Sequence, residues 1–105
     1  QNGVNMTKKM PLPLVEVVWI DAEEEGEVGW NDFAAIKKYA KKPCPLMRSI
    51  GYQVHRSDTH IALVSTLSDD QKVSSTCEKI PAAFIQSITA LTPQKATKEE
   101  KGPPA

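Results

Sequence analysis

Residues 50–67 constrain the fold more than any other segment, because two runs rich in β-branched and aromatic residues flank one polar pair. Ser57 and Asp58 form that pair, and both are common in turns since their short side chains hydrogen-bond nearby main-chain groups. The pattern predicts a β-hairpin. A hairpin is marginally stable by itself, so the rest of the chain must supply further strands that cover its apolar face.

The register of this hairpin follows from the position of its turn. A turn centred on the polar pair places Val54 opposite Ile61 and Tyr52 opposite Leu63, with all four residues on one apolar face. The same register sets the two histidines of the segment directly across from each other. The second face is mostly polar and carries Gln53, His55, His60 and Ala62.

A chain of 105 residues supports one domain with a modest core. We expect this domain to span residues 14–92, between a flexible tail at 1–13 and a disordered tail at 93–105, both polar and interrupted by proline. No apolar run approaches the roughly 20 residues that cross a bilayer, and no secretory signal pattern is present. We therefore expect a soluble, cytoplasmic protein without a membrane partner.

The remaining strands are predicted on either side of the hairpin. Residues 14–20 are apolar except at Glu16, which is typical of a strand covered on both faces, and Trp19 is expected in the core. The acidic run 23–27 predicts a solvated loop. The polar strand 73–80 is expected at an edge of the sheet. Residues 80–91 predict a single helical turn followed by a last short strand.

A short amphipathic helix is predicted between the first strand and the hairpin. The periodicity changes at Trp30, which is expected to pack as a hydrophobic staple. Asn31 or Asp32 can cap a helix that runs to about Lys42 and is ended by Pro43. Its apolar face carries Phe33, Ile36 and Ala40.

Together these elements predict an α+β, mainly β domain, in which about five antiparallel strands bend toward a small barrel. Short motifs occur along it in a fixed order: Val17-x-Trp19-x-Asp21-Ala22, Gly29-Trp30, Ser49-x-Gly51-Tyr52-x-Val54, Ile61-Ala62-Leu63 and Ile80-Pro81-x-x-x-Ile85-x-x-Ile88-x-x-Leu91. In these motifs, from about Val15 to Leu91, the chain resembles a group of small uncharacterised proteins encoded in tailed-phage and prophage genomes. The resemblance implies an Sm-like or SH3-like small β-barrel and a location in the cytoplasm of a bacterial host. It implies no catalytic residue.

The residue types that carry chemistry are few and scattered. Cys44 and Cys77 lack metal-ligand spacing and are expected to be buried or half-buried free thiols. His55 and His60 would need a third ligand to hold a metal ion, and cross-strand polar pairing is the simpler interpretation. No set of acid, base and nucleophile can be assembled, so we expect neither enzymatic activity nor a cofactor.

Two classes of function therefore follow. The favoured class is a non-catalytic interaction or structural module that forms a homo-oligomer through strand edges, or binds another phage or host protein, with proline at Ser75 as the test of the edge. The 13 basic and 13 acidic residues cancel, which argues against a surface built throughout for a polyanion. The alternative is an Sm-like RNA or nucleic-acid binding module, whose phosphate contacts would come from Lys37, Lys38, Lys41, Lys42, Arg48 and Arg56.

Overall fold

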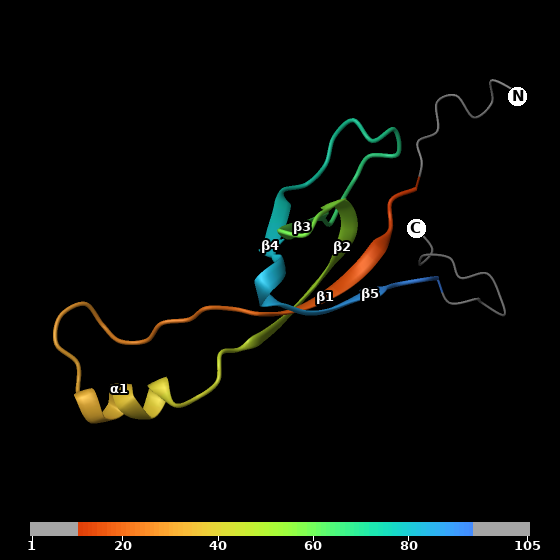
Figure 1. Ribbon diagram of the computed structural model, residues 1–105. Helices are drawn as coiled ribbons and strands as arrows, with labels where there is room; N and C mark the ends of the chain where they lie inside the picture. Colours follow the sequence, from red (N-terminus) through yellow and green to blue (C-terminus); the bar gives the residue numbers. More distant parts are fainter. Residues whose placement is uncertain (1–10, 94–105) are drawn as a thin grey trace, which may run out of the picture.

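The computed structural model describes residues 11–93, in which five antiparallel strands form one open sheet and one short α-helix follows the first strand (Figure 1). The prediction of a mainly β domain with about five antiparallel strands and one short helix is confirmed. Of the tails expected at 1–13 and 93–105, residues 1–10 and 94–105 lie outside the described residues. The elements are β1 (Leu14–Ile20), α1 (Phe33–Ala40), β2 (Leu46–Arg56), β3 (His60–Val64), β4 (Cys77–Pro81), the one-turn helix η2 (Ala82–Phe84) and β5 (Ile85–Ala90).

The strand order is β4-β3-β2-β1-β5, so β4 and β5 are the two edges although they follow each other in the chain. Only η2 separates them, which confirms the prediction of one helical turn before the last strand. The amide of Ala82 donates to the carbonyl of Thr59 over 2.8 Å, which fixes this turn against the tip of the β2–β3 hairpin.

The main hydrophobic cluster occupies one face of the sheet, and Ala62 and Val64 of β3 are buried on the other face. Alternation along each strand sends every second side chain to the face of this cluster, and the side chains of Val17, Ile61 and Ile80 are almost completely buried there. Burial of each such side chain contributes roughly 1.5–3 kcal/mol to the free energy of unfolding. Trp19 is half-buried against this cluster, and its indole Nε1 donates to Ser49 Oγ over 3.0 Å. The core cluster consists of Val15, Val17, Ile61, Leu63 and Ile80, with Trp19, Ile85 and Ile88 packed on it.

The hairpin is present, but its predicted register is wrong. Tyr52 pairs with Val64 and Gln53 pairs with Leu63, so Tyr52 and Leu63 lie on opposite faces of the sheet. Beyond an irregularity after Gln53, His55 pairs with Ala62. Val54 is the extra residue at this bulge, and it is exposed rather than part of the apolar face.

The turn explains part of this shift. Ser57 donates its amide to the carbonyl of His60 over 2.9 Å, so the turn centres on Asp58 and Thr59, one residue later than predicted. The Ser57 hydroxyl accepts from the amide of Thr59 over 3.2 Å and lies 3.0 Å from the Thr59 hydroxyl. This local hydrogen bonding favours the later turn.

The edge strand β4 is shorter than predicted. Of the expected strand 73–80, only the part from Cys77 onward pairs with β3. Ser75 lies before it, and its amide donates to the carbonyl of Thr66 over 2.9 Å within the preceding loop. Proline at position 75 would therefore remove a hydrogen bond within this loop. The substitution proposed from the sequence does not test the outer edge of β4.

Residues 21–45 form an arm, with α1 at the end that lies farthest from the sheet (Figure 1). The structure measures 68 × 36 × 24 Å along its principal axes. The base of the arm is held by the amide of Asp21, which donates to the carbonyl of Pro45 over 3.0 Å. None of the residues of α1 is buried, and Trp30 is fully exposed. The expected hydrophobic staple is therefore not formed.

Candidate interaction surfaces

The outer edge of β4 has main-chain groups that no strand of the described chain pairs with. In antiparallel strands, successive residues face their partner strand and then the other side. Ala82 bonds inward to Thr59, so the alternation directs Ile80 and Glu78 inward and Lys79 outward. Cys77 also faces outward, whereas Pro81 has no amide to offer.

The outer edge of β5 is the second such surface. Leu91 donates its amide to the carbonyl of Leu14 over 2.8 Å, which sets the phase of the β1–β5 ladder. By the same alternation, Thr89 faces β1, and the main-chain groups of Ile88 and Ala90 face outward. The side chains of Thr89 and Ala90 are exposed.

The six basic residues proposed from sequence fall into three places. Lys37, Lys38, Lys41 and Lys42 lie together on α1 and its carboxyl end, exposed and without an ion pair among the described residues. Lys37 Nζ lies 5.6 Å from the centre of the Phe33 ring.

The two arginines lie on β2, away from these lysines. Arg48 is next to the arm and forms an ion pair of 3.4 Å with Glu16. Arg56 ends β2, roughly 26 Å farther along the strand by the usual rise per residue. The structure therefore gathers four of the six residues, and the nucleic-acid site stays a prediction.

His55 and His60 stack on each other, with ring centres 4.9 Å apart, although they are not directly paired. His60 Nδ1 lies 2.8 Å from the Thr59 hydroxyl, which leaves Nε2 as its free ring nitrogen. Within residues 11–93, no three His, Cys, Asp or Glu side chains are grouped closely enough to hold a metal ion. The pair therefore lacks the third ligand that such a site needs.

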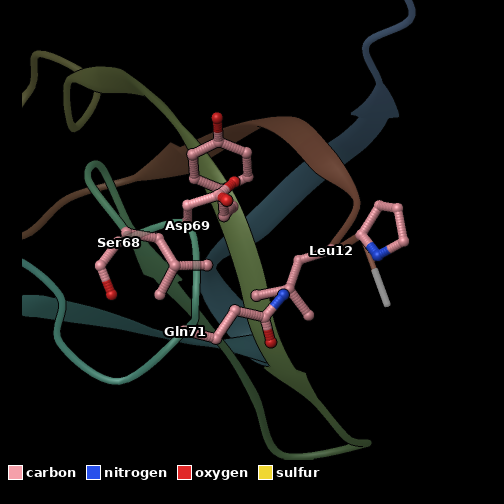
Figure 2. A pocket seen from close by; sticks show the side chains of 7 residues that line it. Leu12, Ser68, Asp69 and Gln71 are labelled. Atoms are coloured by element: carbon pink, nitrogen blue, oxygen red, sulfur yellow. The ribbon is translucent and has the colours of Figure 1, made fainter. Parts of the chain in front are cut away.

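A shallow pocket of about 260 Å³ lies beside the loop after β3. Figure 2 shows Ser68 and Asp69 on the loop side and Leu12 opposite them, on the segment that leads into β1. The Ser68 hydroxyl orders the loop by accepting from the amides of Lys72 and Val73, each over 3.1 Å. The pocket is lined by Pro11, Leu12, Tyr52, Leu67, Ser68, Asp69 and Gln71.

Cys44 and Cys77 are both free, but both are exposed, so the burial expected for them is wrong. The reason is their location, because Cys44 lies in the arm and Cys77 on the outer edge of β4.

Tyr39 lies on α1 next to Glu23 and Glu25 in the first half of the arm. Its hydroxyl is the one shielded side-chain polar atom without a hydrogen-bond partner in the described part of the chain. Desolvation of the hydroxyl, and then the Glu23 carboxylate beside it, raise the pKa of Tyr39 to about 12. Glu25 and Cys44 add to this effect, so Tyr39 lies near both the segment that precedes α1 and the segment that follows it.

Sequence reasoning missed the exposed apolar residues of the arm, Val28 and Phe33. Val28 directly follows the run 23–27, which contains four glutamates. An apolar side chain next to such a solvated run is a sequence signal for an exposed apolar surface.

No family model, curated protein or solved structure matches this chain. Among the described residues, no helix combines the length and the apolar character needed to cross a membrane.

Proposed function

We propose that this chain is a non-catalytic interaction module that forms homo-oligomers by pairing its strand edges. The observation that carries the proposal is the pair of open edges on one sheet, β4 with outward groups at Cys77 and Lys79, and β5 with outward groups at Ile88 and Ala90. An open edge is a template for main-chain pairing with another chain. The β4 edge of one copy and the β5 edge of the next then extend a single sheet across subunits.

The connection between the edges supports a bent, barrel-like sheet of the Sm-like or SH3-like kind. Consecutive strands at opposite edges can be joined by the three residues of η2 only if the sheet curves strongly. The motifs that resemble tailed-phage and prophage proteins fall largely on the strands, with Gly51 and Tyr52 on β2 and Pro81 before η2. We accordingly place the module in the cytoplasm of a bacterial host as a phage or prophage-type protein, with another phage or host protein as a further partner.

The edge is tested by Lys79→Pro, which removes an outward amide without removing a bond to β3. Size-exclusion chromatography with light scattering should show that the parent forms oligomers and that the variant has the mass of a single chain, with an unchanged circular dichroism spectrum. Lys79→Gln is the matched control, because it removes the charge and keeps the amide. An oligomeric Lys79→Pro variant would count against the β4 edge as the interface.

Ala90→Pro applies the same test to the β5 edge, independently of β4. It removes an outward amide near the end of the strand, where proline is best tolerated. Loss of assembly in both variants supports pairing between β4 and β5. If Ala90→Pro assembles like the parent, the partner edge is not β5.

The nucleic-acid alternative rests on the four exposed lysines at the end of α1, which make no ion pair within the described residues. Basic residues near the carboxyl end of a helix also complement its dipole, so the cluster has a structural explanation. Fluorescence anisotropy with a labelled single-stranded RNA at low salt distinguishes the two. Edge assembly predicts no shift, whereas a shift that declines as salt is raised would favour the alternative.

A further inference from the structure

His55 and His60 are the only two histidines of the chain, and the β2–β3 hairpin brings their rings together. His55 pairs with Ala62, so the alternation along β3 places His60 on the same face of the sheet as His55, opposite the main hydrophobic cluster. The two rings meet diagonally across the strands, with centres 4.9 Å apart. His55 is exposed and His60 is half-buried, so the pair is accessible from solvent near the tip of the hairpin.

The spacing of the two rings fits two imidazoles that bind a single metal ion. With metal–nitrogen distances of about 2.0–2.1 Å and a tetrahedral angle at the ion, the centres of two bound rings lie roughly 5 Å apart. Neutral imidazole is the commonest metal ligand in proteins, and it suits Zn²⁺, Ni²⁺ and Cu²⁺. Because both histidines belong to paired strands, their spacing is set by the sheet before an ion binds.

A hydroxyl group orients one of the two rings. His60 Nδ1 lies 2.8 Å from Thr59 Oγ1, which in turn lies 3.0 Å from Ser57 Oγ. When Nδ1 carries the proton, it donates to the Thr59 hydroxyl, and the lone pair of Nε2 is free for an ion. Histidines that bind metals almost always donate their other ring N–H to an oxygen in this way, which fixes the tautomer and the ring orientation.

One copy of the chain supplies only half of the ligands for such an ion. A structural zinc ion takes four ligands, and within residues 11–93 no third His, Cys, Asp or Glu side chain joins the pair. Lys79 lies on the same face, opposite Ala62, but a protonated amine has no lone pair to offer. The other two ligands must therefore come from outside this chain.

We propose that His55 and His60 of two copies together hold one divalent transition-metal ion, such as Zn²⁺, which joins the copies. A two-fold axis through the ion brings the same pair of rings from each copy, and four imidazoles complete the tetrahedron. Metal–ligand bonds hold this contact, so the small exposed tip of the hairpin is sufficient for it. The contact involves neither outer edge of the sheet, so it is independent of the edge pairing proposed above.

Sedimentation velocity of the unmodified chain tests the bridge, with Zn²⁺ as the probe. Added Zn²⁺ should raise the mass measured in EDTA and saturate at one ion per two chains, and excess EDTA should reverse the change. Edge pairing does not depend on a metal ion. Assembly that is the same with Zn²⁺ and with EDTA would therefore overturn the bridge and leave edge pairing standing.

The visible absorption of Co²⁺ reports on the geometry of the bound ion. Four imidazoles predict the intense bands of a tetrahedral site, which should grow together with the rise in mass. Water in the two remaining positions would instead give a complex of one ion with one chain. Saturation at one ion per chain, with weak absorption and no rise in mass, would overturn the bridge between copies.

Substitutions at the hairpin tip separate the ligands from the residue that positions them. His55→Gln and His60→Gln should each abolish the assembly that depends on Zn²⁺. Thr59→Val keeps both imidazoles and the shape of the side chain but removes the hydroxyl, so it should weaken Zn²⁺ binding about tenfold. Asp58→Asn is the matched control and should bind like the parent. If Asp58→Asn abolishes binding, a third ligand comes from the same chain and the proposal is wrong.

The two exposed thiols are the other zinc ligands that need a control. Cys44→Ser combined with Cys77→Ser removes both of them. This variant should assemble with Zn²⁺ as the parent does, because the proposed ligands are imidazoles. Loss of the zinc-dependent rise in mass would identify the thiols as ligands and overturn the histidine bridge. Circular dichroism in EDTA checks that each variant keeps the sheet.

Discussion

Gly51 lies so close to β3 that a Cβ atom placed on it would be 2.8 Å from the carbonyl oxygen of Val64. The neighbouring atom belongs to the main chain, so it cannot rotate away as a side chain could. The missing side chain lets β2 and β3 approach closely at the centre of the sheet, where Gly51 itself is buried.

Gly51→Ala should therefore destabilise the domain by about 1–3 kcal/mol, the usual cost of forcing extra volume into a packed region. Urea denaturation followed by circular dichroism measures this change in the free energy of unfolding. Ile50→Ala, at an exposed neighbouring position, should change it by less than about 0.5 kcal/mol. Equal stabilities of the parent and Gly51→Ala would show that the strands separate without cost.

The hydrogen bond from Trp19 to Ser49 joins β1 and β2 at the border of the core. Ser49→Ala leaves the indole Nε1 without this partner and should cost about 1 kcal/mol of unfolding free energy. A double-mutant cycle with Trp19→Phe isolates the bond, with an expected coupling of about 0.5–1.5 kcal/mol. A coupling of zero would mean that water replaces Ser49 at no cost.

Asp32 caps α1, since its Oδ2 accepts from the amide of Ala35 over 3.1 Å. Asp32→Ala should cost the helix about 1 kcal/mol. Because no residue of α1 is buried, this loss should lower ellipticity at the helix wavelength and speed hydrogen exchange in the arm. The urea midpoint of the sheet should not change. Asp32→Asn retains a capping oxygen and should behave like the parent, whereas a lower midpoint in Asp32→Ala would show that the arm supports the sheet.

The raised pKa of Tyr39 makes the arm sensitive to alkaline pH. Since the folded pKa of about 12 lies above the ordinary value of 10.0, the stability linked to this group is fully present below pH 10. It is lost as pH rises toward 12. In a Tyr52→Phe variant, absorbance at the tyrosinate wavelength follows Tyr39 alone, and Glu23→Gln should lower its midpoint. An ordinary midpoint in both proteins would contradict the contact between Glu23 and Tyr39.

Local signals predicted the elements well. The strand at Leu14–Ile20, the capped helix and the turn after Ile80 each follow from a few neighbouring residues and agree with the structure. The hairpin register failed because the bulge at Val54 and the later turn at Asp58 and Thr59 shift the pairing. A two-residue periodicity contains no information about either shift.

The surfaces were harder to predict than the elements. The amphipathic pattern of α1 indicates which side chains share a face, but it cannot say whether the same chain covers that face. The structure leaves Phe33 and Trp30 exposed. The polar pattern of residues 73–80 predicted an edge strand in this region. Which main-chain groups face β3, as at Glu78, and which face outward, as at Lys79, depends on the observed register.

Self-assembly is tested most directly by sedimentation equilibrium of the unmodified chain from micromolar to near-millimolar concentration. Pairing of the β4 and β5 edges predicts an average mass that rises with concentration toward multiples of the single-chain mass. A mass equal to that of one chain at every concentration would contradict edge pairing.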